Sequence, residues 1–157
     1  MALPTKADGI RQQLLELGID REIIHFDEGV HTAKAAAAAL GIEVGAIANS
    51  LIFQMADAPL LVMTSGRHRV DTVALATQLG EGPIERATPA QVRAATGQVI
   101  GGVAPLGHPA PIRTIVDVAL RDYPQLSAAA GTPDTVFMLT YDELLRITGG
   151  EERVVGD

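Results

Sequence analysis

Residues 101–111 read GGVAPLGHPAP, and the rest of the chain is organised around this stretch. It holds three glycines and three prolines in eleven residues, a composition that suits neither a helix nor an ordinary strand. Proline fixes φ and removes an amide donor, whereas glycine adopts conformations closed to other residues. Apolar segments flank the stretch at 98–100 and 112–116, so we expect a loop of fixed shape that links two core strands and exposes its backbone. A rigid structural turn with no ligand is the alternative interpretation.

Length and composition limit the class of protein. The 157 residues suit one domain spanning 1–157, and 47% of them are apolar, although only 3% are aromatic. With no cysteine, disulfides and thiolate metal sites are excluded. The net charge of −7 excludes a generally basic nucleic-acid binder, so any such contact must be local. No signal pattern and no apolar run of membrane length is present, and we therefore expect a soluble, cytoplasmic protein without membrane contact.

Apolar periodicity and capping residues predict the remaining elements. The N-cap candidates are Thr32, Asp71, Thr88 and Thr140, of which the last two begin capping boxes. Helices are expected at 5–17, 32–40, 72–79, 88–97 and 140–149, and strands at 23–26, 47–56, 60–64, 83–87, 112–116, 127–130 and 135–139. Hairpins beside helices predict an α+β fold, a single domain with a mixed, mainly antiparallel sheet and surrounding helices.

Few motifs carry chemistry. The four histidines lack metal-ligand spacing, and the sequence has neither a nucleophile elbow nor a phosphate-binding loop, so we expect no metal and no cofactor. Three polar features remain: His108 in the loop, the basic triplet 67–69, and Asn49 with Ser50 entering an apolar strand. A solvated turn would explain the triplet, and a satisfied buried amide would explain Asn49.

Four segments in order resemble one family. TA at 32–33, GAIANSLIF at 45–53, RVD at 69–71 and GGVAPLG at 101–107 are similar to the YbaK/prolyl-tRNA-synthetase-associated domain family. The resemblance extends to about residue 149 and implies the editing-domain fold. It also implies trans-editing, the hydrolysis of the ester that joins a wrong, small amino acid to a non-cognate tRNA. The implied partners are the 3′ end of mischarged tRNA and an aminoacyl-tRNA synthetase.

This role gives the loop a chemical purpose. An aminoacyl ester is already activated, so the site must hold the terminal ribose, admit water and stabilise an oxyanion. We expect the amides of Gly101 and Gly102 to face the ester, with Asn49 as the third catalytic residue. Gly102→Ala should then place a methyl group in the pocket and reduce turnover with the fold intact. The residues expected to bind substrate are Thr32, Ser50, His68, Arg69, Ala104, Pro105, Gly107 and His108.

Two positions depart from the family pattern. The family has a lysine where this chain has Asn49, and it commonly has an acidic residue where this chain has Val136, with Asp134 two residues earlier. We expect a nearby cation to replace the lysine, with Arg69 as the first candidate and His68 as the second.

Two alternatives stay open: a non-catalytic module of the same fold that binds tRNA ends or aminoacyl-nucleotides, and an interaction subunit. An arginine directed into the pocket would favour the enzyme. We also expect Asn49 to lie beside the Gly101 to Gly107 loop, and a structure that places Asn49 and Gly102 on opposite faces of the sheet would count against the functional interpretation.

Overall fold

The computed structural model of this chain describes residues 6–27, 30 and 32–156, so the predicted helix start at Thr5 lies outside the described residues. The described helices are α1 (Lys6–Glu16), α2 (Ala33–Leu40), α3 (Thr72–Leu79), α4 (Pro89–Thr96) and α5 (Tyr141–Thr148). The strands are β1 (Ile24–His25), β2 (Ile47–Met55), β3 (Ala58–Ser65), β4 (Ile84–Arg86), β5 (Arg113–Asp117), β6 (Leu126–Ala129), β7 (Thr135–Leu139) and β8 (Glu151–Arg153). Short 3₁₀ helices lie at Val44–Ala46 and Val118–Asp122. In this part of the chain, no helix is both long and apolar enough to cross a bilayer.

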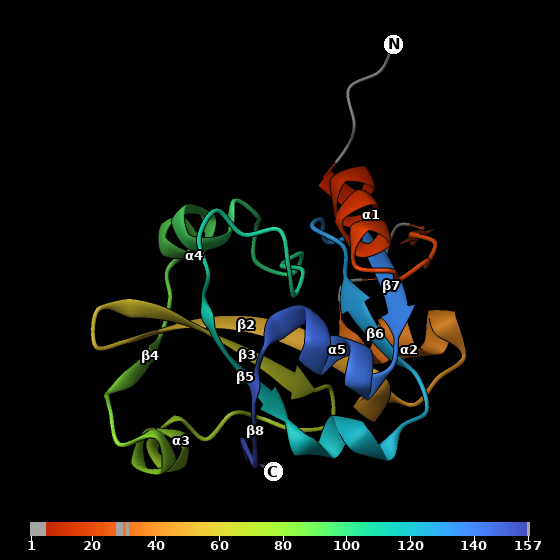
Figure 1. Cartoon of the computed structure of the whole chain (residues 1–157). Coiled ribbons are helices and arrows are strands. Elements are labelled where there is room, and N and C mark those ends of the chain that lie inside the picture. Colours follow the sequence, from red (N-terminus) through yellow and green to blue (C-terminus); the bar gives the residue numbers. More distant parts are fainter. Residues whose placement is uncertain (1–5, 28–29, 31, 157) are drawn as a thin grey trace.

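The strands form one mixed sheet in the order β1-β7-β6-β2-β3-β5-β8, and β4 pairs with β2 as well (Figure 1). The β1–β7, β6–β7, β2–β3 and β2–β4 pairs are antiparallel, whereas β2–β6, β3–β5 and β5–β8 are parallel. The predicted hairpin is the longest pairing and runs from Ala48 opposite Ser65 to Met55 opposite Ala58. These pairings confirm the predicted α+β class with a mixed, mainly antiparallel sheet.

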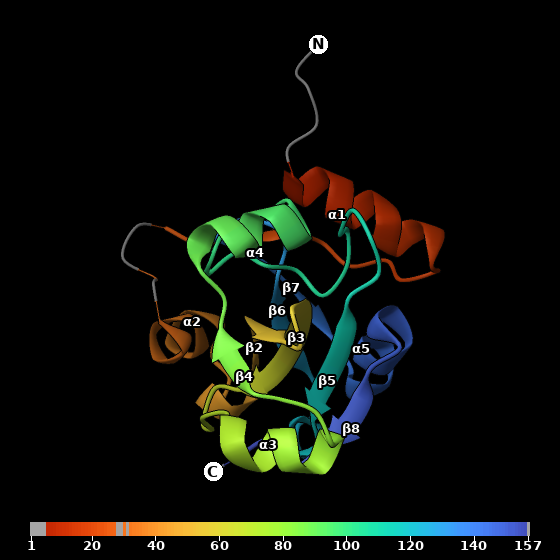
Figure 2. The ribbon, with the colours of Figure 1, turned by 90° about the vertical axis from the view of Figure 1, so that its left-hand side faces the viewer.

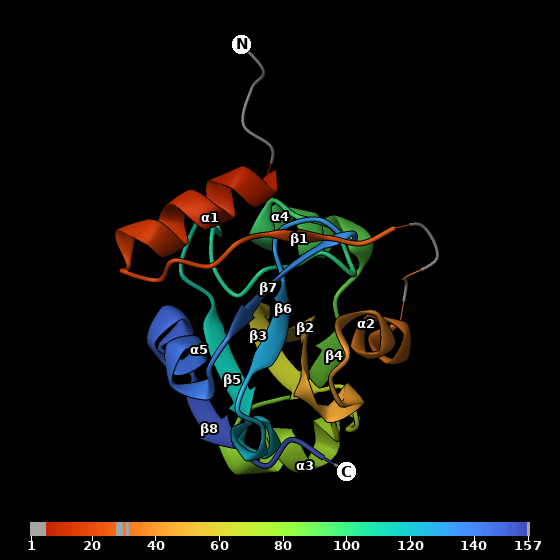
Figure 3. The same ribbon diagram turned by 90° about the vertical axis from the view of Figure 1, so that its right-hand side faces the viewer.

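Helices lie on both faces of the sheet and along two of its sides. In Figure 2, α1 and α4 lie above the sheet and α3 lies below it, and Figure 3 shows α2 and α5 at opposite sides. The largest apolar cluster joins α1, α4 and α5 to the loop residues Val103 and Leu106. A second cluster packs Leu75 of α3 against Phe53 and Ile115 on the opposite face of the sheet. The sheet is therefore buried between two apolar layers.

Local capping chemistry determines where the helices begin. Thr88 and Thr140 each accept a hydrogen bond from the amide three residues later, and the Gln or Glu at that position accepts one from the cap amide. Thr32 and Asp71 cap α2 and α3 in the simpler way, through one side-chain acceptor. All four predicted N-caps are thus confirmed.

Two parts of the fold differ from the sequence prediction. The loop 101–111 does not link two strands, because residues 98–100 form no strand and the chain reaches the loop from the end of α4. The Gln98 side chain explains this, since its Oε1 accepts a hydrogen bond of 2.8 Å from the Ala104 amide and ties this segment to the loop rather than to a neighbouring strand. In addition, β8 was not predicted, because its sequence is charged and it is an edge strand that pairs only with β5.

Candidate active site

A cavity of about 530 Å³ opens beside the outer edge of β2, between α2, α4, β6 and the start of the 101–111 loop. Most of its wall is aliphatic, with side chains that include Ala36, Ile47, Ile52, Val92, Ala129 and Val136. The polar side chains that line it are those of Thr32, Asn49, Ser50, Arg86 and Ser127. Among the lining residues that the structure describes, none is Asp, Glu, His or Cys. The described part of the cavity wall therefore offers polar contacts but no side chain that is an ordinary general base.

The glycine-rich loop borders this cavity through its first residue. Gly101 lines the cavity with φ of 87°, a conformation that favours glycine, and no hydrogen bond engages its amide within the described residues. The Gly102 amide instead donates to the Val99 carbonyl at 2.9 Å, so it is already paired in a turn. A Cβ at Gly102 would lie only 2.6 to 2.8 Å from backbone atoms of Thr132 and Pro133. Gly102 therefore packs against a second loop, and its expected position in the pocket is wrong.

The structure brings together some of the predicted site residues. Thr32, Asn49, Ser50 and Gly101 line the cavity. The predicted residues outside its wall are His68, Arg69, Gly102, Ala104, Pro105, Gly107 and His108. Of these, Gly107 and His108 line a separate hollow of about 290 Å³ beside α1.

His108 and Ala104 have structural contacts instead. The His108 Nε2–H donates to the Ala104 carbonyl at 2.8 Å, which helps to fix the shape of the loop. Burial is the main cause of a lowered His108 pKa, although this hydrogen bond acts in the opposite direction.

Asn49 and Ser50 emerge on opposite faces of β2. Ile52 packs in the same cluster as the loop residue Val103, whereas Phe53 packs against α3 on the other face. Because side chains alternate along a strand, Ser50 shares the loop's face and Asn49 does not. Asn49 therefore lies on the face opposite the loop, which counts against the functional interpretation that joins Asn49 and Gly102 in one site. Asn49 and Ser50 still line one cavity, because the cavity lies beside the part of β2 that no described strand pairs with, between β6 and β4.

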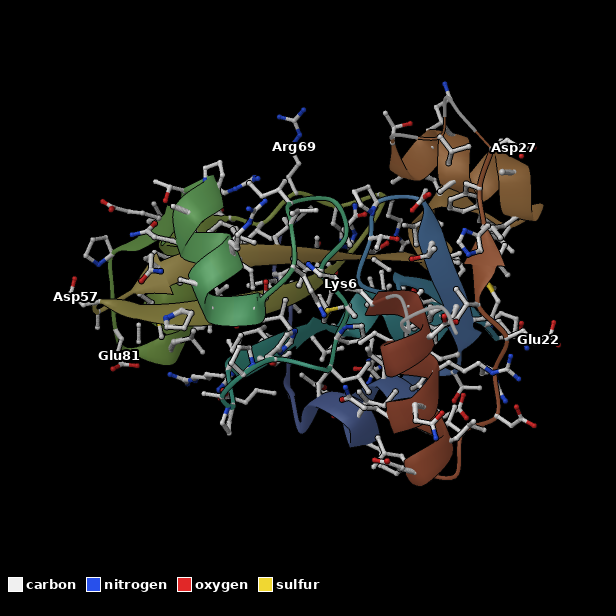
Figure 4. The ribbon with its side chains drawn as sticks, turned by 90° about the horizontal axis from the view of Figure 1, so that it is seen from above. Lys6, Glu22, Asp27, Asp57, Arg69 and Glu81 are labelled. Atoms are coloured by element: carbon white, nitrogen blue, oxygen red, sulfur yellow. The ribbon has the colours of Figure 1, made fainter. Side chains whose placement is uncertain are left out.

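The basic triplet lies away from the cavity wall. Arg69 is exposed, and Figure 4 shows its side chain projecting outward from the sheet. The His68 Nδ1 lies 2.9 Å from the carboxylate of the buried Asp117, which also accepts the Ser65 amide. Arg67 pairs with exposed Asp122. These contacts fix the segment after β3.

Two functional candidates escaped the sequence analysis, Arg86 and Ser127. Arg86 lies on β4 opposite Phe53, and its guanidinium carbon is 5.8 Å from the centroid of the Phe53 ring. Ser127 is 1% exposed, and its hydroxyl has no hydrogen-bond partner within the described residues. The alternation of side chains along β4 and β6 gave only a weak indication of these two residues. The pairing of both strands with β2 is what shows that they border the same cavity. Where the family commonly has an acidic residue, Val136 presents an apolar side chain to the cavity. The nearby Asp134 accepts a hydrogen bond from Thr132.

Comparison with known proteins identifies the family. Residues 27–147 match the model of the aminoacyl-tRNA editing domain. The chain belongs to this family. A solved structure of a candidate trans-editing enzyme for prolyl-tRNA synthetase superposes with a TM-score of 0.92 at 36% identity and covers 99% of both chains. The family resemblance inferred from the sequence is therefore confirmed, and so is the fold.

Sequence relatives agree with this assignment. The proline–tRNA ligase of Nitratidesulfovibrio vulgaris is 30% identical over 107 residues, which are 68% of this chain and 19% of the ligase. The chain thus spans about a fifth of the length of that relative. The uncharacterized protein YwhH of Bacillus subtilis is 26% identical over 136 residues, 86% of each chain.

Proposed function

We propose that this editing-domain protein hydrolyses the ester of mischarged aminoacyl-tRNA in trans and removes a small amino acid. One observation carries the proposal: the cavity joins two polar groups that have no partner among the described residues, the Gly101 amide and the Ser127 hydroxyl, to an aliphatic wall. Such a site suits an ester that is already activated, because it can orient the substrate and stabilise charge without a strong nucleophile.

The reaction requires a water molecule and no other reactant. The water oxygen bonds to the acyl carbon, the carbonyl becomes an oxyanion, and its collapse breaks the bond to the ribose oxygen. One proton of the water is transferred to that ribose oxygen. The second proton of the water is released to solvent, and the amino acid leaves as a carboxylate. Since no carboxylate or imidazole lines the cavity in the described chain, we assign activation of the water to the substrate's own hydroxyl groups and the surrounding backbone.

Three groups receive roles. The Gly101 amide donates to the oxyanion, an interaction typically worth about 3 kcal/mol. The Ser127 hydroxyl holds the ester or the attacking water. Arg86 supplies the positive charge that the family lysine would otherwise provide, since it is the cationic residue among the described cavity-lining residues. Its contact with the terminal phosphate would be charge-assisted.

The relatives suggest a first substrate. Proline–tRNA ligases and a candidate trans-editing enzyme for prolyl-tRNA synthetase are similar to this chain, so proline tRNA with a wrong amino acid is the substrate to test first. The aliphatic wall favours small, uncharged side chains. This substrate would place the reaction in the cytoplasm, with prolyl-tRNA synthetase as a partner.

The test is a deacylation panel. Proline tRNA charged with glycine, alanine, serine or proline is incubated with the protein, and the remaining ester is measured against the uncatalysed rate. We expect at least one small non-cognate ester to be hydrolysed much faster than the prolyl ester. No acceleration with any member would contradict the proposed function.

A binding module without catalysis is the second candidate. Two observations favour it: Asn49 carries no charge, and Val136 is apolar where the family commonly has an acid. Tight binding of the aminoacylated tRNA end with no hydrolysis across the panel would support this candidate over the enzyme.

A further inference from the structure

The outer edge of β2 has a short gap. β6 pairs with β2 at Ile47 and Ala48, and β4 pairs with it only from Phe53 onward. Within the described chain, no strand pairs with the residues between Ala48 and Phe53 on this side. An unpaired strand edge presents amide and carbonyl groups that can bind another extended segment. The gap faces the cavity, because these intervening residues line it.

Hydrogen-bond alternation identifies the groups that face the gap. The Ile47 carbonyl accepts from an amide just beyond β3, whereas the Ile52 carbonyl accepts from the Ala87 amide on the opposite side. Since backbone direction alternates in an antiparallel strand, the N–H and C=O of Ser50 point away from β3 and into the gap. The Ser50 Oγ lies 3.1 Å from the Met63 sulfur, which fits the close side chains of a pair that exchanges no backbone bonds.

We infer that the Ser50 backbone holds the amino acid part of the ester, an inference that rests on the proposed function. The Ser50 carbonyl accepts a hydrogen bond from the substrate α-amino group, and the Ser50 N–H donates to the substrate carbonyl oxygen. This is the bonding of a single residue added to a strand edge. The occupant is one amino acid rather than a peptide, because β6 and β4 close the gap on either side of Ser50.

In this arrangement the groups that bind the amino acid differ from the groups that select its side chain. Two backbone hydrogen bonds are the same for every amino acid, so they cannot discriminate between side chains. Side chains of paired residues lie on the same face, and the substrate side chain would therefore lie on the face of Ser50. That face carries Val92 and Val103, both buried, which would limit the size of the side chain accepted.

Substrate analogues test the inference on the unmodified protein. Proline tRNA is acylated with alanine and with propionate, and each rate is divided by its uncatalysed rate because the esters differ in reactivity. Propionate carries no hydrogen-bond donor on its α carbon, so this ratio should be at least tenfold lower for the propionyl ester. Equal ratios for the alanyl and propionyl esters would overturn the inference while the proposed function stands. If the alanyl ester is stable, the member of the panel that is hydrolysed replaces alanine, and hydrolysis of none refutes the proposed function itself.

A backbone substitution tests the other hydrogen bond. Incorporation of the α-hydroxy analogue of serine at position 50 replaces the N–H by an ester oxygen, and Ser50→Ala is the control that keeps the N–H. We expect kcat/KM of the ester variant to lie at least tenfold below that of Ser50→Ala, with little difference in melting temperature between the two. Unchanged activity in the ester variant would overturn the inference. So would a large loss of stability, because it would mean that the N–H belongs to the sheet.

Discussion

Gly102→Ala should damage the fold before it affects chemistry, contrary to the expectation from the sequence. The new Cβ would lie 2.6 Å from the Thr132 carbonyl carbon and 2.7 Å from the Pro133 nitrogen. Carbon atoms pack comfortably at about 3.5–4.0 Å, so the loops at 101–102 and 132–133 must separate by roughly 1 Å. No side-chain rotation can relieve the contact, because the opposing atoms belong to the backbone.

The expected cost follows from overpacking. Forced insertion of a methyl group typically costs about 1–3 kcal/mol, and we expect the upper half of that range because the neighbours are rigid. For a chain of this length each kcal/mol lowers the melting temperature by about 2–4 °C, so a decrease of roughly 5–10 °C is expected. Gly9→Ala is the matched control, since a Cβ there meets nothing within 4 Å and the residue lies in α1. It should raise stability slightly, because alanine favours a helix over glycine by about 0.5–1 kcal/mol.

Thermal unfolding and single-turnover deacylation of both variants separate the two effects. Because Gly101 lines the cavity, movement of this loop should also reduce turnover per folded molecule for Gly102→Ala. A Gly102→Ala melting temperature equal to that of the wild type would refute the packing argument. If turnover then fell as well, the residue would face the substrate as the sequence had suggested.

Three further changes probe the cavity cation, a helix cap and the loop. Arg86→Ala should lower kcat/KM roughly 10- to 100-fold, since a hydrogen bond to a charged group is worth about 1.5–3 kcal/mol. Arg69→Ala and Arg93→Ala should have smaller effects, and equal effects of the three changes in single-turnover assays would contradict the role of Arg86. Thr140→Ala removes the cap of α5 and should cost about 1 kcal/mol in denaturant unfolding with normal deacylation. The His108 pKa is lowered by burial, so the unfolded chain binds the proton first and stability falls as pH drops through the ordinary value of 6.5. Urea unfolding at pH 7.5 and 5.5 should therefore show a larger loss for the wild type than for His108→Gln.

Elements with strong local chemistry were predictable from the sequence. Both capping boxes were, because the threonine and its partner three residues later satisfy each other without help from the rest of the fold. The β2–β3 hairpin was also predictable, since turn-forming residues at 57–59 separate two apolar runs. The turn itself lies at 56–57, and β3 already begins at Ala58. Strand β8 was not, because a run of two glutamates and an arginine has no strand pattern of its own.

The parts of the site that escaped prediction depend on pairings between distant segments. Arg86 lies in the cavity wall because β4 pairs with β2 more than thirty residues away, and no local pattern identifies that partner. Sequence proximity to the hairpin favoured Arg69 instead, yet the chain leaves the sheet at Ser65 and presents Arg69 to solvent. A cation can be predicted from the missing lysine, but its identity follows only from the pairing.

Strand geometry also explains why we assign substrate binding to Ser50, although Asn49 is the more distinctive residue in the sequence. The side-chain amide of Asn49 is distinctive in the sequence because it stands where the family has a lysine. In the structure a period of two places that side chain on the face opposite the glycine loop, and the alternation of backbone groups directs the N–H and C=O of Ser50 into the gap. Backbone N–H and C=O groups are the same for nearly every residue type, so the sequence alone does not show which of them bind a ligand. If the Ser50 backbone binds the substrate, loss of the lysine removes a charged contact but leaves the amino acid's two hydrogen bonds in place, and a cation on β4 is sufficient to complete the site.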